Sequence, residues 1–315
     1  MATTVTAQDV VRPATVAEAA LRRPTRSLWS DAWRQFRRHR LAMFGIVALG
    51  LLLVMTLVGP LVYRTPSDTI DYSQGLLGPS LQHPFGTDDL GRDLLARAML
   101  GGRVSMAVGV VAVLIAITLG TCIGAVAGFF GGRVDGTLMR LTDLFLALPV
   151  LPFLLMVTYL FRDPIKKVFG PELGIFLLIV TVIGSLNWMP LARLVRASFL
   201  SIKEKEFVEA ARCTGASNRR LILTHILPNT LSAVIVAATV GVGAAIITES
   251  ALSFLGVGFP PDMPTWGRLL YDAQNFLDLG PHWAIFPGLL IFLTVLSINY
   301  IGDGLRDALD PRKTH

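Results

Sequence analysis

The chain has 315 residues, of which 53% are hydrophobic and 16% are charged. Soluble globular domains carry about 25% charged residues, so this composition excludes an ordinary soluble domain and indicates a protein that crosses a membrane several times. The two cysteines are too few for a disulfide framework. The net charge is +6, and the basic residues are distributed unevenly across the membrane topology derived below. This distribution explains the positive charge, so we expect no nucleic-acid partner.

Six apolar runs are each long enough to cross a bilayer, which needs about 20 apolar residues. The first run is too long for a cleaved signal peptide, and about 40 residues precede it. Pro149 and Pro152 predict a kink in the third run. We therefore predict an all-α integral membrane protein with six transmembrane helices. The runs cover residues 41–63, 104–130, 138–161, 173–198, 231–256 and 283–303.

Lys and Arg residues are concentrated on one side of this predicted topology. If the N-terminus is cytoplasmic, 20 of the 28 lie in cytoplasmic segments and 8 lie outside. The positive-inside rule therefore predicts that both termini are cytoplasmic. The predicted organisation is a disordered cytoplasmic tail (1–26), an interfacial amphipathic helix (27–40), the first span with an extracytoplasmic segment (41–103), a membrane core (104–303) with a cytoplasmic loop (199–230), and a cytoplasmic C-terminal tail (304–315).

The segment 27–40 has an apolar and a basic side when it is drawn as a helix. An amphipathic helix of this kind lies at the membrane surface, here at the inner leaflet. Two roles stay open for it: an orientation signal and anchor, or a binding surface. Its apolar side carries Leu28, Trp29, Ala32, Trp33 and Phe36, and its arginines are Arg34, Arg37, Arg38 and Arg40.

The extracytoplasmic segment ends in a sequence that favours a short helix over the mouth of the bundle. Thr87 is a suitable N-cap, and the acidic residues after it favour a first helical turn. Gly101 and Gly102 follow the apolar stripe and predict the end of this helix before the second span begins.

Two carboxylates inside the predicted spans need an explanation. Asp143 lies three residues after Arg140, and an ion pair between them is a sufficient structural account. Glu249 lies deep in the fifth run without a basic residue nearby. An intramembrane carboxylate faces the bundle interior or a water-filled cavity. Glu249 can therefore line or gate a pathway, or form a structural hydrogen bond to a neighbouring helix.

Most catalytic motifs are missing from the sequence. The dipeptide Gly-Lys never occurs, so the chain cannot form a P-loop, and its histidines show no metal-ligand spacing. The strongest enzymatic alternative is an intramembrane aspartyl protease with Asp143 and Asp303 as the catalytic pair. The sequence YIGDG around Asp303 matches the Gly-x-Gly-Asp signature only in part, because Tyr300 replaces the first glycine. A membrane scaffold without transport activity is a further alternative.

The cytoplasmic loop between the fourth and fifth runs predicts two short helices joined by a sharp turn. Gly215 can adopt the left-handed conformation that ends the first helix, and Ser217 can cap the second. Pro228 disfavours a helical conformation at Leu227 and can open the fifth span. A helix tied at both ends to membrane spans moves when those spans move. This geometry suits a mechanical coupler, although an ordinary basic loop on the inner leaflet has the same charge.

This loop resembles the EAA motif of bacterial ABC importer permeases. The motif residues are Glu209, Ala210, Ala211, Gly215, Leu227 and Pro228, and the isoleucine that usually stands two positions before Leu227 is replaced by His225. The segments HPFGTDDLGRD (83–93), DLFLALPVLP (143–152), TESALSFLGVG (248–258) and GDGLRDALDPR (302–312) resemble the C-type permease of dipeptide, oligopeptide and nickel importers. The resemblance covers about residues 80–315.

The resemblance implies a type I ABC importer permease in the bacterial cytoplasmic (inner) membrane. Two permease subunits would form the pore, two P-loop ATPase subunits would bind ATP and Mg on the cytoplasmic side, and an extracytoplasmic protein would deliver the substrate. The chain itself would bind no cofactor and no metal and would contact membrane lipid. Glu209 would be a polar anchor for an ATPase subunit, Ala210 and Ala211 would permit close packing, and Gly215 would set the turn. The substrate would be a di- or oligopeptide, with nickel or another small solute as the alternative.

Overall fold

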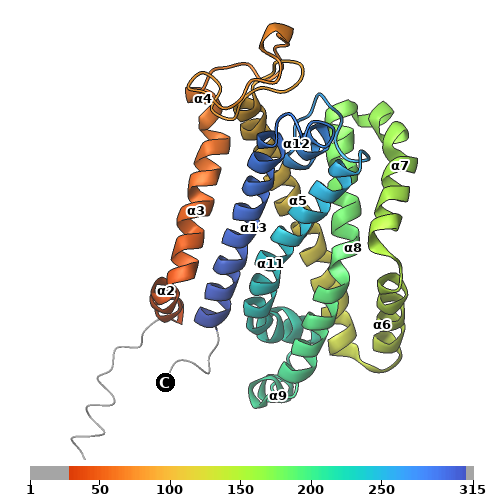
Figure 1. Cartoon of the computed structure of the whole chain (residues 1–315). Helices are drawn as coiled ribbons and strands as arrows, with labels where there is room; N and C mark the ends of the chain where they lie inside the picture. Colours follow the sequence, from red (N-terminus) through yellow and green to blue (C-terminus); the bar gives the residue numbers. More distant parts are fainter. Residues whose placement is uncertain (1–27, 310–315) are drawn as a thin grey trace, which may run out of the picture.

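The computed structural model describes residues 28–309, so the predicted tail 1–26 lies outside the described residues. The described part is a helical bundle, and its β structure is limited to one isolated bridge between Thr87 and Asp93. Figure 1 shows the long helices side by side, with irregular segments and short helices at both ends. The elements are α2 (Leu28–Arg38), α3 (Arg40–Leu57), α4 (Gly59–Val62), η1 (Tyr72–Gln74), α5 (Leu94–Phe130), α6 (Gly132–Leu146), α7 (Val150–Phe169), α8 (Pro171–Ile202), α9 (Glu206–Cys213), α10 (Asn218–Arg220), the π-helix η2 (Leu221–Ile226), α11 (Leu227–Phe254), α12 (Trp266–Ala273) and α13 (His282–Leu309).

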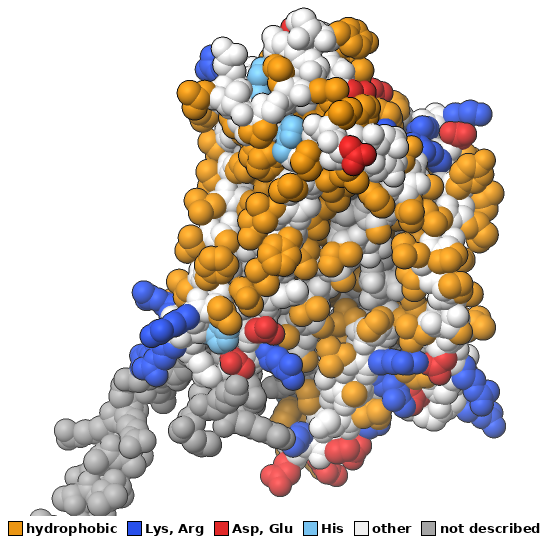
Figure 2. Space-filling model, viewed as in Figure 1, with side chains coloured by type: hydrophobic (Ala, Val, Ile, Leu, Met, Phe, Trp, Pro, Cys, Tyr) orange, Lys and Arg blue, Asp and Glu red, His pale blue; other side chains and the backbone are white. Residues whose placement is uncertain are grey.

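The described part of the chain contains five or six membrane-crossing helices, where the sequence predicts six. Within residues 28–309, five helices are long and apolar enough to cross a membrane, and the bent pair α6–α7 makes up to six. Figure 2 shows apolar side chains over the middle of the molecule, while Lys, Arg, Asp and Glu gather toward its two ends. A bilayer solvates such a surface, because its apolar band faces lipid and its charged rims face the headgroups and water.

Helices α5 and α8 pack closely because α5 presents glycines to α8. A Cβ atom added to Gly120 would lie 2.8 Å from the carbonyl oxygen of Trp188, and one added to Gly124 would lie 2.5 Å from that of Ala192. Real Cβ atoms do not approach so closely, so a larger residue at either position would push the helices apart. Small residues allow this approach in lipid, where dispersion contacts rather than hydrophobic burial hold helices together.

The predicted boundary between the outer short helix and the second span is wrong. Helix α5 begins at Leu94, with the Asp93 carboxylate accepting a hydrogen bond from Ala96 N, and it continues through Gly101 and Gly102. Those glycines serve packing instead of ending the helix. A Cβ atom at Gly102 would lie 2.7 Å from the ring of Trp266, which is fully buried.

The third span contains the predicted break. Helices α6 and α7 meet at an angle of 84°, and Pro149 is the N-cap residue of α7. The predicted pairing of Asp143 with Arg140 is not what the structure shows, because Asp143 forms an ion pair with Arg193 of α8. At the other end of the chain, α13 runs on to Leu309, so the predicted C-terminal tail begins as helix.

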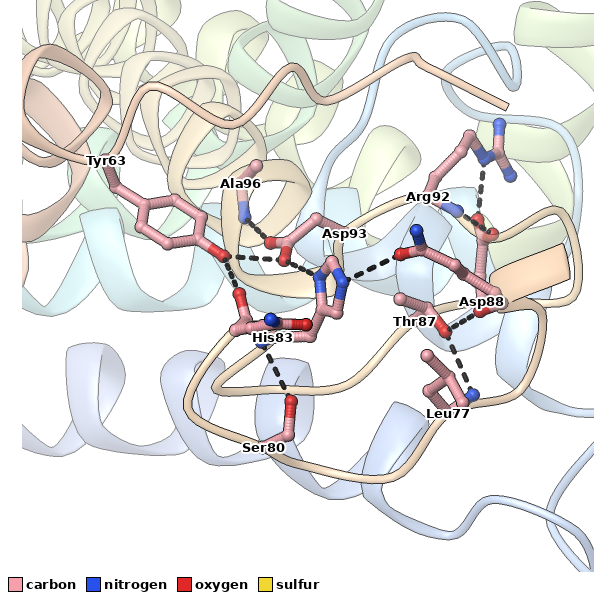
Figure 3. Close-up of polar contacts among 11 residues, drawn as sticks. Tyr63, Leu77, Ser80, His83, Thr87, Asp88, Arg92, Asp93 and Ala96 are labelled. Atoms are coloured by element: carbon pink, nitrogen blue, oxygen red, sulfur yellow. Dashed lines mark hydrogen bonds and ion pairs between the residues drawn. The ribbon is translucent and has the colours of Figure 1, made fainter. Parts of the chain in front are cut away.

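The segment between α4 and α5, which the sequence predicts to be extracytoplasmic, forms a lobe, here called the outer lobe, that is organised by the buried carboxylate of Asp93 (Figure 3). Its Oδ2 atom accepts a hydrogen bond from Tyr63 Oη at 2.7 Å and lies 2.8 Å from His83 Nδ1. On the other side of the ring, His83 Nε2 lies 3.0 Å from Gln74 Oε1. Burial and the hydrogen bond to Asp93 raise the pKa of Tyr63 to about 12, so the phenol stays protonated and donates to the carboxylate. This network joins the end of the first span to the start of α5.

Candidate functional site

Helix α9 extends beyond the ends of the membrane-crossing helices. Figure 1 shows it at the lower end of the bundle, between the ends of α8 and α11. Three residues separate α8 from α9, and four separate α9 from α10. Short connections of this kind transmit displacement, because they leave the chain little freedom to absorb it. The helix is therefore a protruding element that is mechanically tied to two spans.

The turn after α9 has the geometry that the sequence predicts. Gly215 has a φ angle of +85°, which is the left-handed conformation. The N–H of Gly215 donates to Arg212 O at 3.0 Å, and the N–H of Ala216 donates to Ala211 O at 3.1 Å. This pair of bonds is the Schellman motif, which satisfies carbonyl groups that the helix end leaves free. Gly215 thus fixes the direction in which the chain leaves α9.

The second half of the loop follows the prediction at its start and departs from it at its end. The side chain of Ser217 caps α10 by accepting a hydrogen bond from Arg220 N at 3.4 Å. The chain then passes through the π-helix η2 directly into α11, and Leu227 is helical, with φ −57° and ψ −45°. The predicted interruption at Leu227 is therefore wrong. Leu227 N–H donates to Ile222 O, five residues back, and Pro228 fits at the start of α11 because its missing N–H is not needed there.

The inward face of α9 is fixed to the bundle through Val208. Its side chain is fully buried in an apolar cluster with Phe199 of α8 and Leu221 of η2. Ala211 packs against the same cluster and is partly buried. The small Ala211 side chain therefore permits close packing within this chain, and Leu227 is also partly buried against the cluster.

The outward face of α9 has no partner within the described chain. Glu209 and Ala210 are exposed, and the phenyl ring of Phe207 is 46% exposed. Aromatic side chains, Phe included, are enriched at protein–protein interfaces, so the exposed ring of Phe207 is available to a partner. The predicted roles of Glu209 and Ala210 toward an ATPase stay predictions.

A groove of about 720 Å³ opens between α5, α8, α11 and the last turns of α13. Its lining is mainly apolar, with polar contributions from Asn187, Ser232 and Arg306. Sequence reasoning did not identify this groove, although small residues at intervals of three or four positions on the fifth span were a usable signal. Those residues are Ala233, Ala237, Gly241 and Ala244.

The groove and the cluster beneath α9 share part of their structure. Leu191 of α8 and Ala237 of α11 line the groove and also belong to the cluster that buries Val208. Protein interiors are close-packed, so displacement of Val208 displaces these neighbours. The helix and the groove wall thus share one apolar cluster.

Glu249 is fully buried where α5, α11 and α12 meet. Ser253 Oγ donates to Glu249 Oε1 at 2.8 Å, and Ser105 Oγ of α5 donates to Oε2 at 3.1 Å. Ser105 Oγ in turn accepts from the N–H of Trp266 at 3.2 Å. The hydrogen bond to a neighbouring helix, one of the two predicted roles, is present. Glu249 is not among the residues that line the groove, and its role in a pathway or gate stays a prediction. Sequence reasoning did not find Ser105, because nothing local links it to Glu249.

The geometry gives no support to the protease alternative. Asp143 is paired with Arg193, and its side chain is 59% exposed. Asp303 is also exposed. An aspartyl protease needs two carboxyl groups that share one proton in a protected site. Neither residue has such surroundings.

Residues 120–315 match the family described as binding-protein-dependent transport system inner membrane component, and residues 27–81 match the N-terminal TM domain of oligopeptide transport permease C. The chain belongs to this family of transport permeases. It is 40% identical over 289 residues to the oligopeptide transport system permease protein OppC of Haemophilus influenzae. The aligned region covers 91% of this chain and 89% of the relative. It is 40% identical over 296 residues to the dipeptide transport system permease protein DppC of Bacillus subtilis, covering 93% and 88%.

A third relative is the glutathione transport system permease protein GsiD of Escherichia coli O157:H7, which is 39% identical over 288 residues and covers 91% of each chain. Among solved structures, an inward-facing MetNI methionine ABC transporter matches with a TM-score of 0.52 at 17% identity, covering 67% of this chain and 94% of that chain. This likeness shows the fold of a type I ABC importer permease.

Membership of the permease family settles the class of the protein. The chain is a multi-pass inner membrane subunit of a transporter and not an enzyme. Permeases of this family work with an ATPase and with a substrate-binding protein.

Proposed function

We propose that this chain is one of two permease subunits of an ATP-driven importer for di- or oligopeptides. A second, homologous permease closes the open side of the groove, and two P-loop ATPases bind ATP and Mg on the side of α9. An extracytoplasmic binding protein delivers the substrate at the outer lobe. The chain itself binds no cofactor and no metal. Both of its termini lie in the cytoplasm, because the α9 end of the molecule carries the excess of basic residues.

The observation that carries the proposal is the outward face of α9. This face presents Phe207, Glu209 and Ala210 to solvent at the end of the molecule, while Val208 ties the same helix to the groove wall. When the ATPases close, they push α9, and the push reaches α8 and α11 through the cluster around Val208. The bundle then changes from an inward-facing to an outward-facing state, which is alternating access by rigid-body motion.

Two observations support a peptide as the substrate. The names of three relatives with about 40% identity specify oligopeptide, dipeptide and glutathione, all of which are short peptides. The groove of about 720 Å³ falls within the range of about 300–1,000 Å³ that small-molecule sites occupy. Its mainly apolar wall with few polar groups suits a passage that must not hold its substrate tightly.

The first experiment is purification of the tagged chain from its native membrane in mild detergent, followed by mass spectrometry. We expect a P-loop ATPase and a second six-span subunit in the purified complex. The complex is then reconstituted with its binding protein, and uptake of labelled dipeptide, labelled tripeptide and nickel is compared. ATP-dependent peptide uptake supports the proposal. Nickel uptake without peptide uptake, or recovery of the chain alone under conditions that preserve other complexes, would overturn it.

A further inference from the structure

Helix α2 joins a basic exposed face to an apolar face that is wedged into the bundle. Arg34, Arg37 and Arg38 follow one another at helical spacing and are all exposed. Phe36 points the other way and is only 4% exposed. Figure 2 shows basic side chains gathered at the end of the molecule where Figure 1 places α2, at the lower edge of the apolar surface.

The exposed face has the chemistry of a site for anionic lipid. Trp33 is 57% exposed and lies beside the arginines on α2. Tryptophan favours the headgroup level of a bilayer. Each arginine near the surface raises the affinity for anionic headgroups roughly fivefold. Nearby acidic groups only partly offset this charge: Asp31 lies on α2 itself, and Asp307 of α13 lies 4.0 Å from His39.

The buried face of α2 packs against the end of α13. Phe36 packs against Gly304, where an added Cβ atom would lie 3.0 Å from the phenyl ring, and against Ala308. Gln35 Nε2 donates to the carbonyl oxygen of Asp307 at 2.8 Å. The neighbouring positions on the same turns, Arg306 and Leu309, line the groove. The placement of α2 therefore fixes the placement of two groove residues.

We propose that α2 binds anionic phospholipid headgroups of the leaflet at the α9 end, and that this contact holds the end of α13 beside the groove. The lipid surface then becomes a regulator of the permease, because it acts through α2 on Arg306 and Leu309. The proposal depends on the position of α2 at the membrane surface and does not depend on which solute is transported.

The test uses Trp33 as its own reporter. The complete transporter is placed in phosphatidylcholine nanodiscs that contain equal mole fractions of either dibrominated phosphatidylglycerol or dibrominated phosphatidylcholine. Bromine quenches nearby tryptophan fluorescence, and subtraction of a Trp33→Phe variant isolates the Trp33 signal. We expect stronger quenching by the anionic lipid, with a preference that falls roughly fivefold for each arginine removed.

Paired variants separate lipid binding from general charge effects. Arg34→Gln with Arg38→Gln should lower the preference about 25-fold. The control variant Lys166→Gln with Lys167→Gln removes the same charge in the last turn of α7 and should keep the preference. Equal quenching by both lipids in the natural protein would overturn the proposal. So would a preference that is unchanged in the arginine variant.

The link to α13 has its own readout. ATPase activity of the reconstituted complex should rise with phosphatidylglycerol in the natural protein and should not respond in Phe36→Ala, which keeps the arginines but loosens the grip on α13. Lipid preference at Trp33 with a lipid-independent ATPase would refute the coupling. Failure to transport peptides would leave the quenching result unaffected, so the two proposals fail separately.

Discussion

The turn at Gly215 allows a graded test of the coupling helix. An added Cβ atom there would meet nothing within 4 Å, so a substitution changes the backbone energy without a steric clash. A non-glycine residue pays about 1–2 kcal/mol to hold the left-handed conformation, and asparagine tolerates it best. Proline fixes φ near −65° and removes the N–H that donates to Arg212 O, so its cost is about 3 kcal/mol or more.

These energies predict an order of activities. A cost of about 1 kcal/mol reduces the correctly formed turn roughly fivefold relative to misdirected forms, and about 3 kcal/mol reduces it more than 100-fold. ATP-dependent uptake in proteoliposomes should therefore be nearly normal for Gly215→Asn, reduced for Gly215→Ala and lost for Gly215→Pro. Immunoblots of the membrane fraction should show normal insertion of all three variants.

A matched control exists on the opposite side of the molecule. Gly170, between α7 and α8, has a φ angle of +83° and also has nothing within 4 Å of an added Cβ atom. Gly170 has a ψ angle of 169°, a region that essentially only glycine adopts, so Gly170→Ala introduces a backbone strain at least as large far from α9, and uptake should stay normal. Normal uptake by Gly215→Pro, or an equal loss in Gly170→Ala and Gly215→Ala, would refute the coupling role.

Three further predictions follow from the described contacts. Glu209→Lys reverses the charge on the exposed face of α9 and should abolish uptake without affecting membrane insertion. If the variant still purifies together with the ATPase, Glu209 has no docking role. Glu249→Gln should preserve uptake because it can still bond the hydroxyl of Ser105, and loss of uptake in a correctly assembled complex would favour the gating role instead. Tyr63→Phe should destabilise the outer lobe by about 1.5–3 kcal/mol, since the bond to the Asp93 carboxylate is lost, and should lower the melting temperature. The raised pKa of Tyr63 keeps its phenol protonated, so this stabilisation is complete below pH 10 and is lost as the pH rises toward about 12. The pH titration of tyrosinate absorbance measures this pKa. A tyrosinate component that titrates near pH 10 and is missing in Tyr63→Phe would contradict the prediction.

The membrane architecture could be predicted because its signal is strong and local. A bilayer requires long apolar helices that satisfy their own backbone, so hydropathy alone indicated six spans. The ends of individual helices could not be predicted where tertiary contacts decide the conformation. Gly101 and Gly102 look like a helix end in the sequence, but Gly101 lies against the backbone of Thr265 and Gly102 against the ring of Trp266, so both are packing residues inside α5. Leu227 precedes a proline, yet the wider π turn before it keeps the chain helical.

In the candidate site too, features set by neighbouring residues could be predicted, and features set by distant contacts could not. The left-handed Gly215 and the cap at Ser217 depend on backbone chemistry within a few residues, and both were predicted correctly. The partner of Glu249 is Ser105, which is 144 positions away, and the groove needs four helices at once. No periodicity within a single segment contains this information.

The meeting of local and distant contacts is what makes the α9 region suited to coupling. Gly215 sets the direction of the loop, and the burial of Val208 against Phe199 and Leu221 holds α9 against the bundle in addition to its short connections. Because Leu191 and Ala237 belong both to this cluster and to the groove wall, a displacement of α9 must either repack the cluster or move the groove wall. Close packing favours the second outcome, and movement of the groove wall is the step through which the proposed coupling would act.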